Sequence, residues 1–220
     1  MVTSRKMTNF LRSLIQENDP FLLEMQRIAR EERIPIIPPE SANFLEILIR
    51  ISGIQKILEI GTSIGYSAIV FSKAMGPGGK VYTIEIDENT IEKARENFAK
   101  AGVLDQIIVF QGDVMEILPY MQGKYDMIFM DGPKGHYEEC LDYFLPLLRD
   151  GGILVYDNVL FRGMVSGDRK LKRRKITIVK RMRSFLKVLS THPQLHTTIL
   201  PIGDGLSVSI KRKEFAHETT

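Results

Sequence analysis

Five acidic side chains stand within or just beyond short apolar runs of this 220-residue chain. They are Glu59, Glu85, Asp113, Asp131 and Asp157. If the runs are parallel strands of one sheet, their carboxyl ends lie along a single edge, which is where such sheets bind ligands. One acid at that place often only caps the next helix. Five of them are difficult to assign to capping alone and predict an acidic ligand site.

Oxygen donors follow two of these runs and predict a cation site. Asp131 ends one run, and Asp157 and Asn158 end the next. Oxygen ligands with open coordination positions suit Mg²⁺, or Mn²⁺ in its place. The histidines at positions 136, 192, 196 and 217 show no pairing of the kind that zinc requires. The alternative is that the three side chains are helix caps and an ordinary surface pair.

A lysine follows the first of these acids closely. Lys134 comes three residues after Asp131, in a loop that contains two glycines and a proline. Beside a bound cation its ammonium group would lose a proton more easily, so it is a candidate general base. The alternative is a surface ion pair, which is the more common fate of a single lysine.

The stretch 56–67 predicts a cofactor loop. An apolar strand leads into a turn with Gly61 and Gly65 and then into a helical pattern. The spacing G-x-x-x-G lacks the third glycine of the dinucleotide fingerprint. Glu59 would also repel a pyrophosphate, so a cationic ligand such as S-adenosylmethionine fits better. Glu85, about 20 residues further on, is placed to bind the hydroxyls of a ribose. The alternative is an ordinary strand-to-helix turn.

Alternating strand and helix patterns must position these residues. The strands are predicted at 56–61, 80–85, 107–110, 125–130 and 153–156, with 197–201 and 206–210 as a closing pair. Helices are predicted between them at 66–75, 88–101, 114–121, 137–148 and 172–190. Asp150-Gly151-Gly152 reads as the turn before the fifth strand. Repeated units of this kind predict a largely parallel sheet covered by helices.

The N-terminal quarter of the chain reads differently. Residues 3–33 carry apolar spacings of one or two helices, and Asp19-Pro20 is a helix start. The proline-containing stretch 34–39 must be extended. A further helix begins near Ser41 and ends near Gly53.

Composition is that of a soluble globular protein, with 44% hydrophobic and 26% charged residues. No apolar stretch reaches the roughly 18 residues of a membrane span, and the N-terminus lacks the apolar core of a signal peptide. The single cysteine, Cys140, excludes an internal disulfide and fits a reducing compartment. We therefore expect a cytoplasmic protein without a membrane partner.

Positive charge is concentrated in one stretch. Residues 169–183 hold nine cations and no acid, whereas the chain as a whole is only +3. The nine are Arg169, Lys170, Lys172, Arg173, Arg174, Lys175, Lys180, Arg181 and Arg183. Clustered cations of this kind neutralise nucleic-acid phosphates. A solvated helix face is the alternative, and both signs normally intermix there.

Taken together, four motifs make the chain resemble the metal-dependent class I O-methyltransferases related to catechol and caffeoyl-CoA O-methyltransferases. They are Leu58-Glu59-Ile60-Gly61-Thr62 with Gly65-Tyr66-Ser67; Asp131 with Lys134-Gly135-His136-Tyr137; Asp157-Asn158-Val159-Leu160; and Pro201-Ile202-Gly203-Asp204-Gly205. The resemblance implies a Rossmann-like fold: a seven-stranded, mostly parallel sheet with helices on both faces and extra N-terminal helices. It makes 1–220 one domain, with a helical cap at 1–55, the core at 56–212 and a tail at 213–220. Gly132-Pro133 departs from the Asp-Ala that often precedes the lysine loop.

The resemblance also implies roles for individual residues. Ile37, Glu59, Gly61 and Ser67 would surround the methionine part of S-adenosylmethionine, Glu85 would hold the ribose, and Asp113 with Val114 would contact the adenine. Asp131, Asp157 and Asn158 would bind Mg²⁺ or Mn²⁺. Asp131 would also border the cofactor, and Lys134 would be the base.

Within this family the chain most resembles the bacterial tRNA 5-hydroxyuridine methyltransferases, through 157–165, the basic stretch and 201–206. The resemblance implies O-methylation of the wobble uridine in the tRNA anticodon loop, with Arg169, Lys170, Lys172, Arg173, Arg174 and Lys175 holding the RNA backbone. A small-molecule enzyme of the catechol or caffeoyl-CoA type is the alternative, and a non-enzymatic RNA-binding module is a third. The resemblance and the apolar N-terminal helices predict a homodimer.

Overall fold

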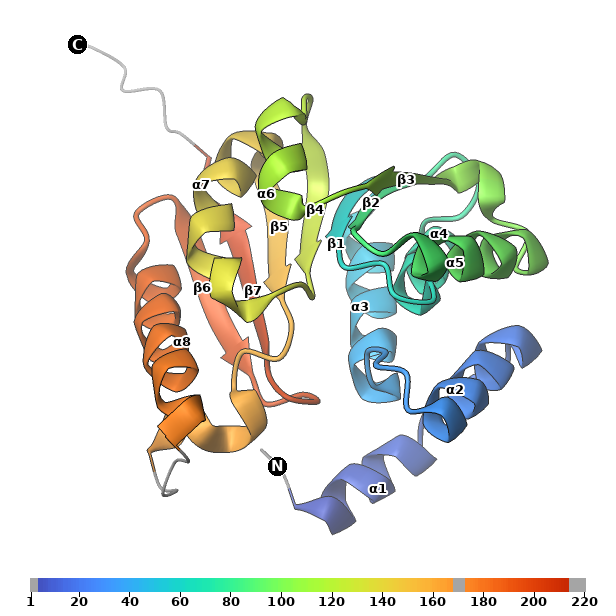
Figure 1. The fold of residues 1–220 in the computed structure, drawn as a ribbon, viewed down its shortest axis with the longest axis horizontal. Coiled ribbons are helices and arrows are strands. Elements are labelled where there is room, and N and C mark those ends of the chain that lie inside the picture. Colours follow the sequence, from blue (N-terminus) through green and yellow to red (C-terminus); the bar gives the residue numbers. More distant parts are fainter. Residues whose placement is uncertain (1–3, 168–172, 214–220) are drawn as a thin grey trace.

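A computed structural model describes residues 4–167 and 173–213. Within these ranges seven strands form one sheet in the order β3-β2-β1-β4-β5-β7-β6 (Figure 1). The strands are β1 (Lys56–Ile60), β2 (Lys80–Glu85), β3 (Ile107–Gln111), β4 (Tyr125–Met130), β5 (Leu148–Tyr156), β6 (Leu195–Leu200) and β7 (Leu206–Lys211). The first five are mutually parallel, and β7 is antiparallel to both β5 and β6. The predicted mostly parallel sheet with a closing pair is confirmed.

Helices connect the strands and extend the N-terminus. The α-helices of the described residues are α1 (Arg5–Ser13), α2 (Pro20–Glu32), α3 (Pro39–Ser52), α4 (Tyr66–Met75), α5 (Glu88–Lys100), α6 (Val114–Ile117), α7 (Tyr137–Leu147) and α8 (Arg173–Thr191). Short 3₁₀ turns are η1 (Leu104–Gln106), η2 (Leu118–Tyr120), η3 (Lys134–His136) and η4 (Phe161–Ser166). No helix in the described part of the chain is long and apolar enough to cross a membrane.

Alternate residues of the central strands pack into two separate cores. On β4, Met127 and Phe129 belong to the core under α2, α3, α4 and α5, whereas Ile128 and Met130 belong to the core under α6, α7 and α8. Figure 1 shows these two helical layers on opposite faces of the sheet. Because both faces of the sheet are buried, residues on either face are mostly apolar, and the central strands are nearly continuous apolar runs without regularly alternating polar residues.

Two of the differences from the expected boundaries have a clear physical reason. β5 begins at Leu148, so Gly151 and Gly152 lie inside the strand, where the pairing with β4 shifts register between Tyr125 and Met127. A glycine pair inside a strand is typical of such an irregularity. α3 begins at Pro39, because a proline at the first helical position needs no N–H partner, so Ser41 lies inside the helix and does not open it.

The order of the strands determines where a ligand crevice can form at the edge of the sheet. From β1 the chain moves outward to β2 and β3, then returns to β4 on the other side of β1 and continues to β5. The connections after β1 and β4 therefore leave in opposite directions, and a crevice opens where they part. The residues that follow β1, β4 and β5 meet there.

Candidate active site

Backbone hydrogen bonds hold the ends of the three central strands together. The Asp131 N–H donates to Ile60 O at 3.0 Å, and the Asp157 N–H donates to Met130 O at 3.0 Å. These bonds continue the parallel ladder one residue past each strand. Asp131 and Asp157 therefore start adjacent loops at the same level of the sheet.

The predicted oxygen donors converge at this point. Asn158 Nδ2 donates to Asp131 Oδ1 at 2.8 Å, and the Asn158 N–H donates to Asp157 Oδ1 at 2.6 Å. Asn158 has a φ of 60°, a left-handed conformation that is uncommon for a non-glycine residue. Backbone strain of this kind is often found at functional sites. Here it turns the amide side chain back toward Asp131.

Electrostatics at the pair favour a bound cation. Burial raises the pKa of Asp157 above its ordinary value, and the charge of Asp131 raises it further. Burial also raises the pKa of Asp131, while nearby Lys134 and the hydrogen bond from Asn158 lower it. Two buried carboxylates this close repel each other, and a positive charge between them would relieve the repulsion.

The chemistry of these side chains fits a hard divalent ion. No cluster of three or more His, Cys, Asp or Glu side chains able to hold a metal is found within the described ranges. The predicted set has two carboxylates and one amide, which are oxygen donors of the kind that Mg²⁺ and Mn²⁺ accept. Asn158 faces Asp131 through its nitrogen, and a half-turn of the amide would present its oxygen instead.

Glu59 lies fully buried in β1, next to this pair. Its Oε1 accepts from Ser67 Oγ at 2.5 Å, and its Oε2 accepts from Thr83 Oγ1 at 2.7 Å. Burial raises the pKa of Glu59 to about 7, while the two hydroxyls act in the opposite direction. Glu59 and Ser67 are thus brought together as predicted, and their contact is direct.

The glycine loop is shaped mainly by packing. A Cβ on Gly61, at φ +96°, would lie 2.8 Å from the carbonyl oxygen of Asp131. A Cβ on Gly65, at φ +83°, would lie 2.3 Å from the ring of Phe98. We expected both glycines to let the backbone approach a ligand. In the structure Gly61 lets the β1 loop meet the β4 loop, and Gly65 makes room for α5.

The remaining predicted cofactor residues border the same edge. Glu85 ends β2, and its carboxylate accepts from the Ser63 N–H at 3.1 Å and the Ile86 N–H at 2.9 Å, so it supports the glycine loop. Asp113 caps α6 through the Met115 N–H at 2.8 Å, and Val114 is buried. Capping therefore accounts for Asp113 even without a ligand.

Two further predicted residues lie on flanking segments. Ile37 is buried in the extended segment before α3. Lys134 begins η3, and its Nζ lies 5.9 Å from the centre of the Tyr137 ring. Its charge lowers the pKa of Asp131, Asp157 and Asp204, so the ammonium group is near enough to influence all three acids.

Three supporting residues were not assigned a role from the sequence. Asp204, in the β6–β7 turn, accepts from the Arg162 N–H, and its carbonyl accepts from the Leu160 N–H at 2.9 Å. Tyr137 is buried and donates to the Asp157 carbonyl at 2.9 Å. Thr83 supports Glu59. Asp204 and Tyr137 lie inside recognised motifs, which was an available signal, whereas a strand threonine such as Thr83 gives none.

The basic stretch is only partly described. Arg169, Lys170 and Lys172 lie outside the described residues, and Arg173 and Arg174 are placed only as the first residues of α8. Lys175 Nζ lies 5.9 Å from the centre of the Phe161 ring. Arg183 Nε donates to Val165 O at 2.8 Å, so this cation holds η4 against α8.

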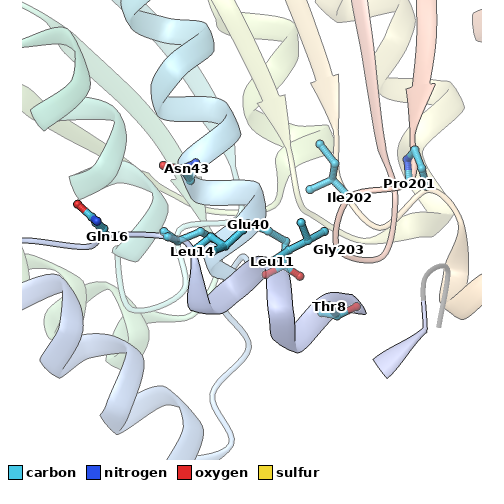
Figure 2. Close-up of a pocket in the computed structure, with 10 residues that line it drawn as sticks. Thr8, Leu11, Leu14, Gln16, Glu40, Asn43, Pro201, Ile202 and Gly203 are labelled. Atoms are coloured by element: carbon cyan, nitrogen blue, oxygen red, sulfur yellow. The ribbon is translucent and has the colours of Figure 1, made fainter. Parts of the chain in front are cut away.

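A groove of about 580 Å³ is lined by none of the acids at the strand ends. Figure 2 shows Leu11 of α1 and Leu14, which directly follows that helix, across from Ile202 and Gly203 of the β6–β7 turn. Its lining is largely apolar and contains none of the predicted cofactor or metal residues. We therefore place the chemistry at the strand ends, where the buried acids are.

Comparisons with known proteins show the family of the chain. A family model described as O-methyltransferase matches residues 12–212. The chain is 30% identical to a catechol O-methyltransferase of Niastella koreensis over 92% of its length and 95% of that protein. A putative caffeoyl-CoA O-methyltransferase from Staphylococcus aureus superposes with a TM-score of 0.86 at 32% identity, covering 94% of this chain and 99% of the other.

The O-methyltransferase TomG from Streptomyces achromogenes, solved in complex with SAM, superposes with a TM-score of 0.81 at 27% identity. It covers 94% of this chain and 96% of its own. The family model spans most of the sequence, including every strand of the sheet. The chain therefore belongs to the O-methyltransferase family.

Proposed function

We propose that this chain transfers the methyl group of S-adenosylmethionine to a hydroxyl oxygen that has a second oxygen beside it, with the help of a divalent ion. The observation that carries the proposal is the convergence of Asp131, Asp157 and Asn158 beside the β1 loop. An acidic crevice suits a cationic donor and a cation-assisted acceptor. The relative TomG, solved with SAM, supports the choice of donor.

The chain's own residues would bind and orient the two reactants. Glu59 and the β1 loop would hold the methionine part of the donor, and Glu85 would hold the ribose. Asp131, Asp157 and Asn158 would hold Mg²⁺ or Mn²⁺, which when bound lowers the pKa of an acceptor hydroxyl. Lys134, near these acids, would accept the proton from that hydroxyl. Alignment of the oxygen with the methyl group would supply much of the acceleration.

For the acceptor we propose 5-hydroxyuridine at the wobble position of tRNA, whose 5-hydroxyl and 4-carbonyl oxygens are neighbours. α8 contacts both η3, which carries Lys134, and η4, which follows Asn158. At the start of α8, Lys175 Nζ lies 5.9 Å from the centre of the Phe161 ring in η4. Single-stranded loops are the RNA elements whose bases can enter a pocket, and the cations would hold the phosphates.

The test is methyl transfer by the purified protein, followed by mass spectrometry of the tRNA nucleosides. With Mg²⁺, S-adenosylmethionine and tRNA containing 5-hydroxyuridine, we expect 5-methoxyuridine to form. Replacing Arg173, Arg174 and Lys175 by Ala should weaken tRNA binding and reduce its dependence on salt. A matched control replaces three exposed cations of α5, namely Lys93, Arg95 and Lys100. Equal losses in the two triple variants would reject the α8 interface.

A second candidate is supported by the comparisons. Catechol and caffeoyl-CoA O-methyltransferases are among the relatives, and both names describe small acceptors. In that case the basic stretch would be incidental or would bind an anionic substrate such as a CoA ester. Catechol and caffeoyl-CoA in the same assay distinguish the candidates. Rapid turnover of either one, with none on tRNA, would favour this second function.

A further inference from the structure

A chain of buried hydroxyl groups ends on Glu59. Thr62 Oγ1 lies 2.6 Å from Thr83 Oγ1, Thr83 Oγ1 lies 2.7 Å from Glu59 Oε2, and Ser67 Oγ lies 2.5 Å from Glu59 Oε1. Thr62, Thr83 and Glu59 are each at most 1% exposed. The four side chains come from the β1 loop, β2, β1 and the first turn of α4. The network therefore joins β1, β2 and α4 around the glycine loop.

The direction of each hydrogen bond follows from counting protons. A hydroxyl has one proton to donate. Thr83 donates its proton to Glu59 Oε2, so it must accept from Thr62. Ser67 donates its proton to Glu59 Oε1. Two hydroxyls thus donate directly to the carboxylate and the third donates to Thr83, an arrangement that stabilises the ionised form of Glu59.

No cation of the described chain balances this charge. Within the described residues, the charges that influence the pKa of Glu59 are those of Asp131 and Glu85, and both raise it. An ionised, buried carboxylate without a positive partner is unfavourable until a cationic ligand arrives. The hydroxyls thus help to keep the site anionic before the ligand binds.

We infer that Thr83 is a positioning residue that holds Glu59 as an anion in the methionine region, so that the site prefers the cationic methyl donor to its uncharged thioether product. This inference rests on the proposed use of S-adenosylmethionine. The donor carries a sulfonium charge that S-adenosylhomocysteine lacks, and charge differences count for more in a buried site than in water. Product release after each turnover would benefit from the same difference.

Isothermal titration with each of the two ligands, in the presence of Mg²⁺, tests the inference. Thr83→Val keeps the shape of the side chain but removes the donor to Glu59. We expect it to weaken S-adenosylmethionine binding by about tenfold, as for one hydrogen bond to a charged group. S-adenosylhomocysteine binding should change by less than about threefold on the same scale. Thr83→Ser restores the hydroxyl and should restore the wild-type ratio of the two dissociation constants.

The matched control is Thr197→Val. Thr197 lies on β6, and its hydroxyl pairs with Ser209 at 2.8 Å, away from Glu59. This change should leave the ratio of dissociation constants unaltered. The inference is overturned if Thr83→Val weakens both ligands equally, weakens neither, or shifts the ratio no more than Thr197→Val does.

A second variant protects the test against misfolding. Thr62→Val removes the hydroxyl that donates to Thr83, and it should shift the ratio in the same direction by a smaller factor. An unchanged ratio in a folded Thr62→Val protein would count against the network if Thr83→Val did not fold. Failure of the wild-type protein to bind either ligand would instead reject the proposed function, so the two failures are distinguishable.

Discussion

Desolvation of carboxylates governs the chemistry of individual residues in this site. Glu59, Asp131 and Asp157 are all raised in pKa, chiefly by burial. Such groups cluster at functional sites because a ligand, and not the protein, supplies the missing charge. The sequence predicted which acids gather at the strand ends, because the carboxyl ends of parallel strands share an edge. It did not predict Thr83, because a threonine inside a strand is ordinary.

Removing Asp157 should separate catalysis from cofactor binding. Asp157→Ala takes away one of the two converging carboxylates but leaves Glu59 and the glycine loop intact. We expect turnover to fall by at least about a hundredfold, since a metal supplies several kcal/mol of stabilisation, with little change in S-adenosylmethionine affinity. Asp142→Ala, on the exposed side of α7, is the control. Full activity of the Asp157→Ala protein in EDTA would contradict the proposed mechanism.

The pH dependence of stability should report the burial of Glu59. Its folded-state pKa of about 7 lies above the ordinary value of 4.5. The folded protein therefore binds this proton more tightly than the unfolded chain. The resulting stabilisation is complete below about pH 4.5 and is lost as pH rises through about 7. This difference between the folded-state and the ordinary pKa is equivalent to about 3 kcal/mol of stability.

Chemical denaturation of the ligand-free protein at several pH values measures this effect. Between about pH 5 and pH 7.5 the free energy of unfolding should fall less steeply in Glu59→Gln than in the wild type. The other buried acids contribute in the same direction, so a residual slope is expected. Identical slopes in the two proteins would show that folding does not raise the pKa of Glu59.

At the scale of elements, the site depends on close contact between loops that follow neighbouring strands. The boundaries of β1, α4 and β2 agree closely with those predicted, because glycines and apolar runs mark them. The start of β5 was wrong by five residues, since Gly151 and Gly152 resemble a turn and lie inside an irregular strand. The close contact between Gly61 and Asp131 could not be predicted from the sequence either, because it depends on how two loops pack.

Two glycine substitutions separate loop packing from backbone strain. Gly61 and Gly78 have nearly equal φ values of +96° and +95°, but a Cβ on Gly78 meets nothing within 4 Å. Gly78→Ala should therefore cost only the left-handed conformation, about 1 kcal/mol. Gly61→Ala should cost at least about 2 kcal/mol in unfolding free energy, because it adds a clash with the Asp131 backbone. Equal losses in thermal or chemical denaturation would show that this contact is not tight.

At the scale of the whole molecule, one fold serves many acceptors, and the acceptor is chosen by the surface around the crevice. We propose that this surface includes the start of α8, η4 and the N-terminal helices. Phe10 of α1 and Leu14, which follows that helix, are 58% and 60% exposed. We propose that a homodimer covers this face, and light scattering on the purified protein would check it. A monomer would leave these side chains in solvent.

The convergence of Asp131, Asp157 and Asn158 on a single cation is tested most directly by crystals grown with Mn²⁺ and S-adenosylhomocysteine. Anomalous scattering locates the metal independently of the protein atoms. We predict one strong peak within ligand distance of all three side chains and beside the bound cofactor. A peak elsewhere, or none with the three side chains turned apart, would contradict the proposed site.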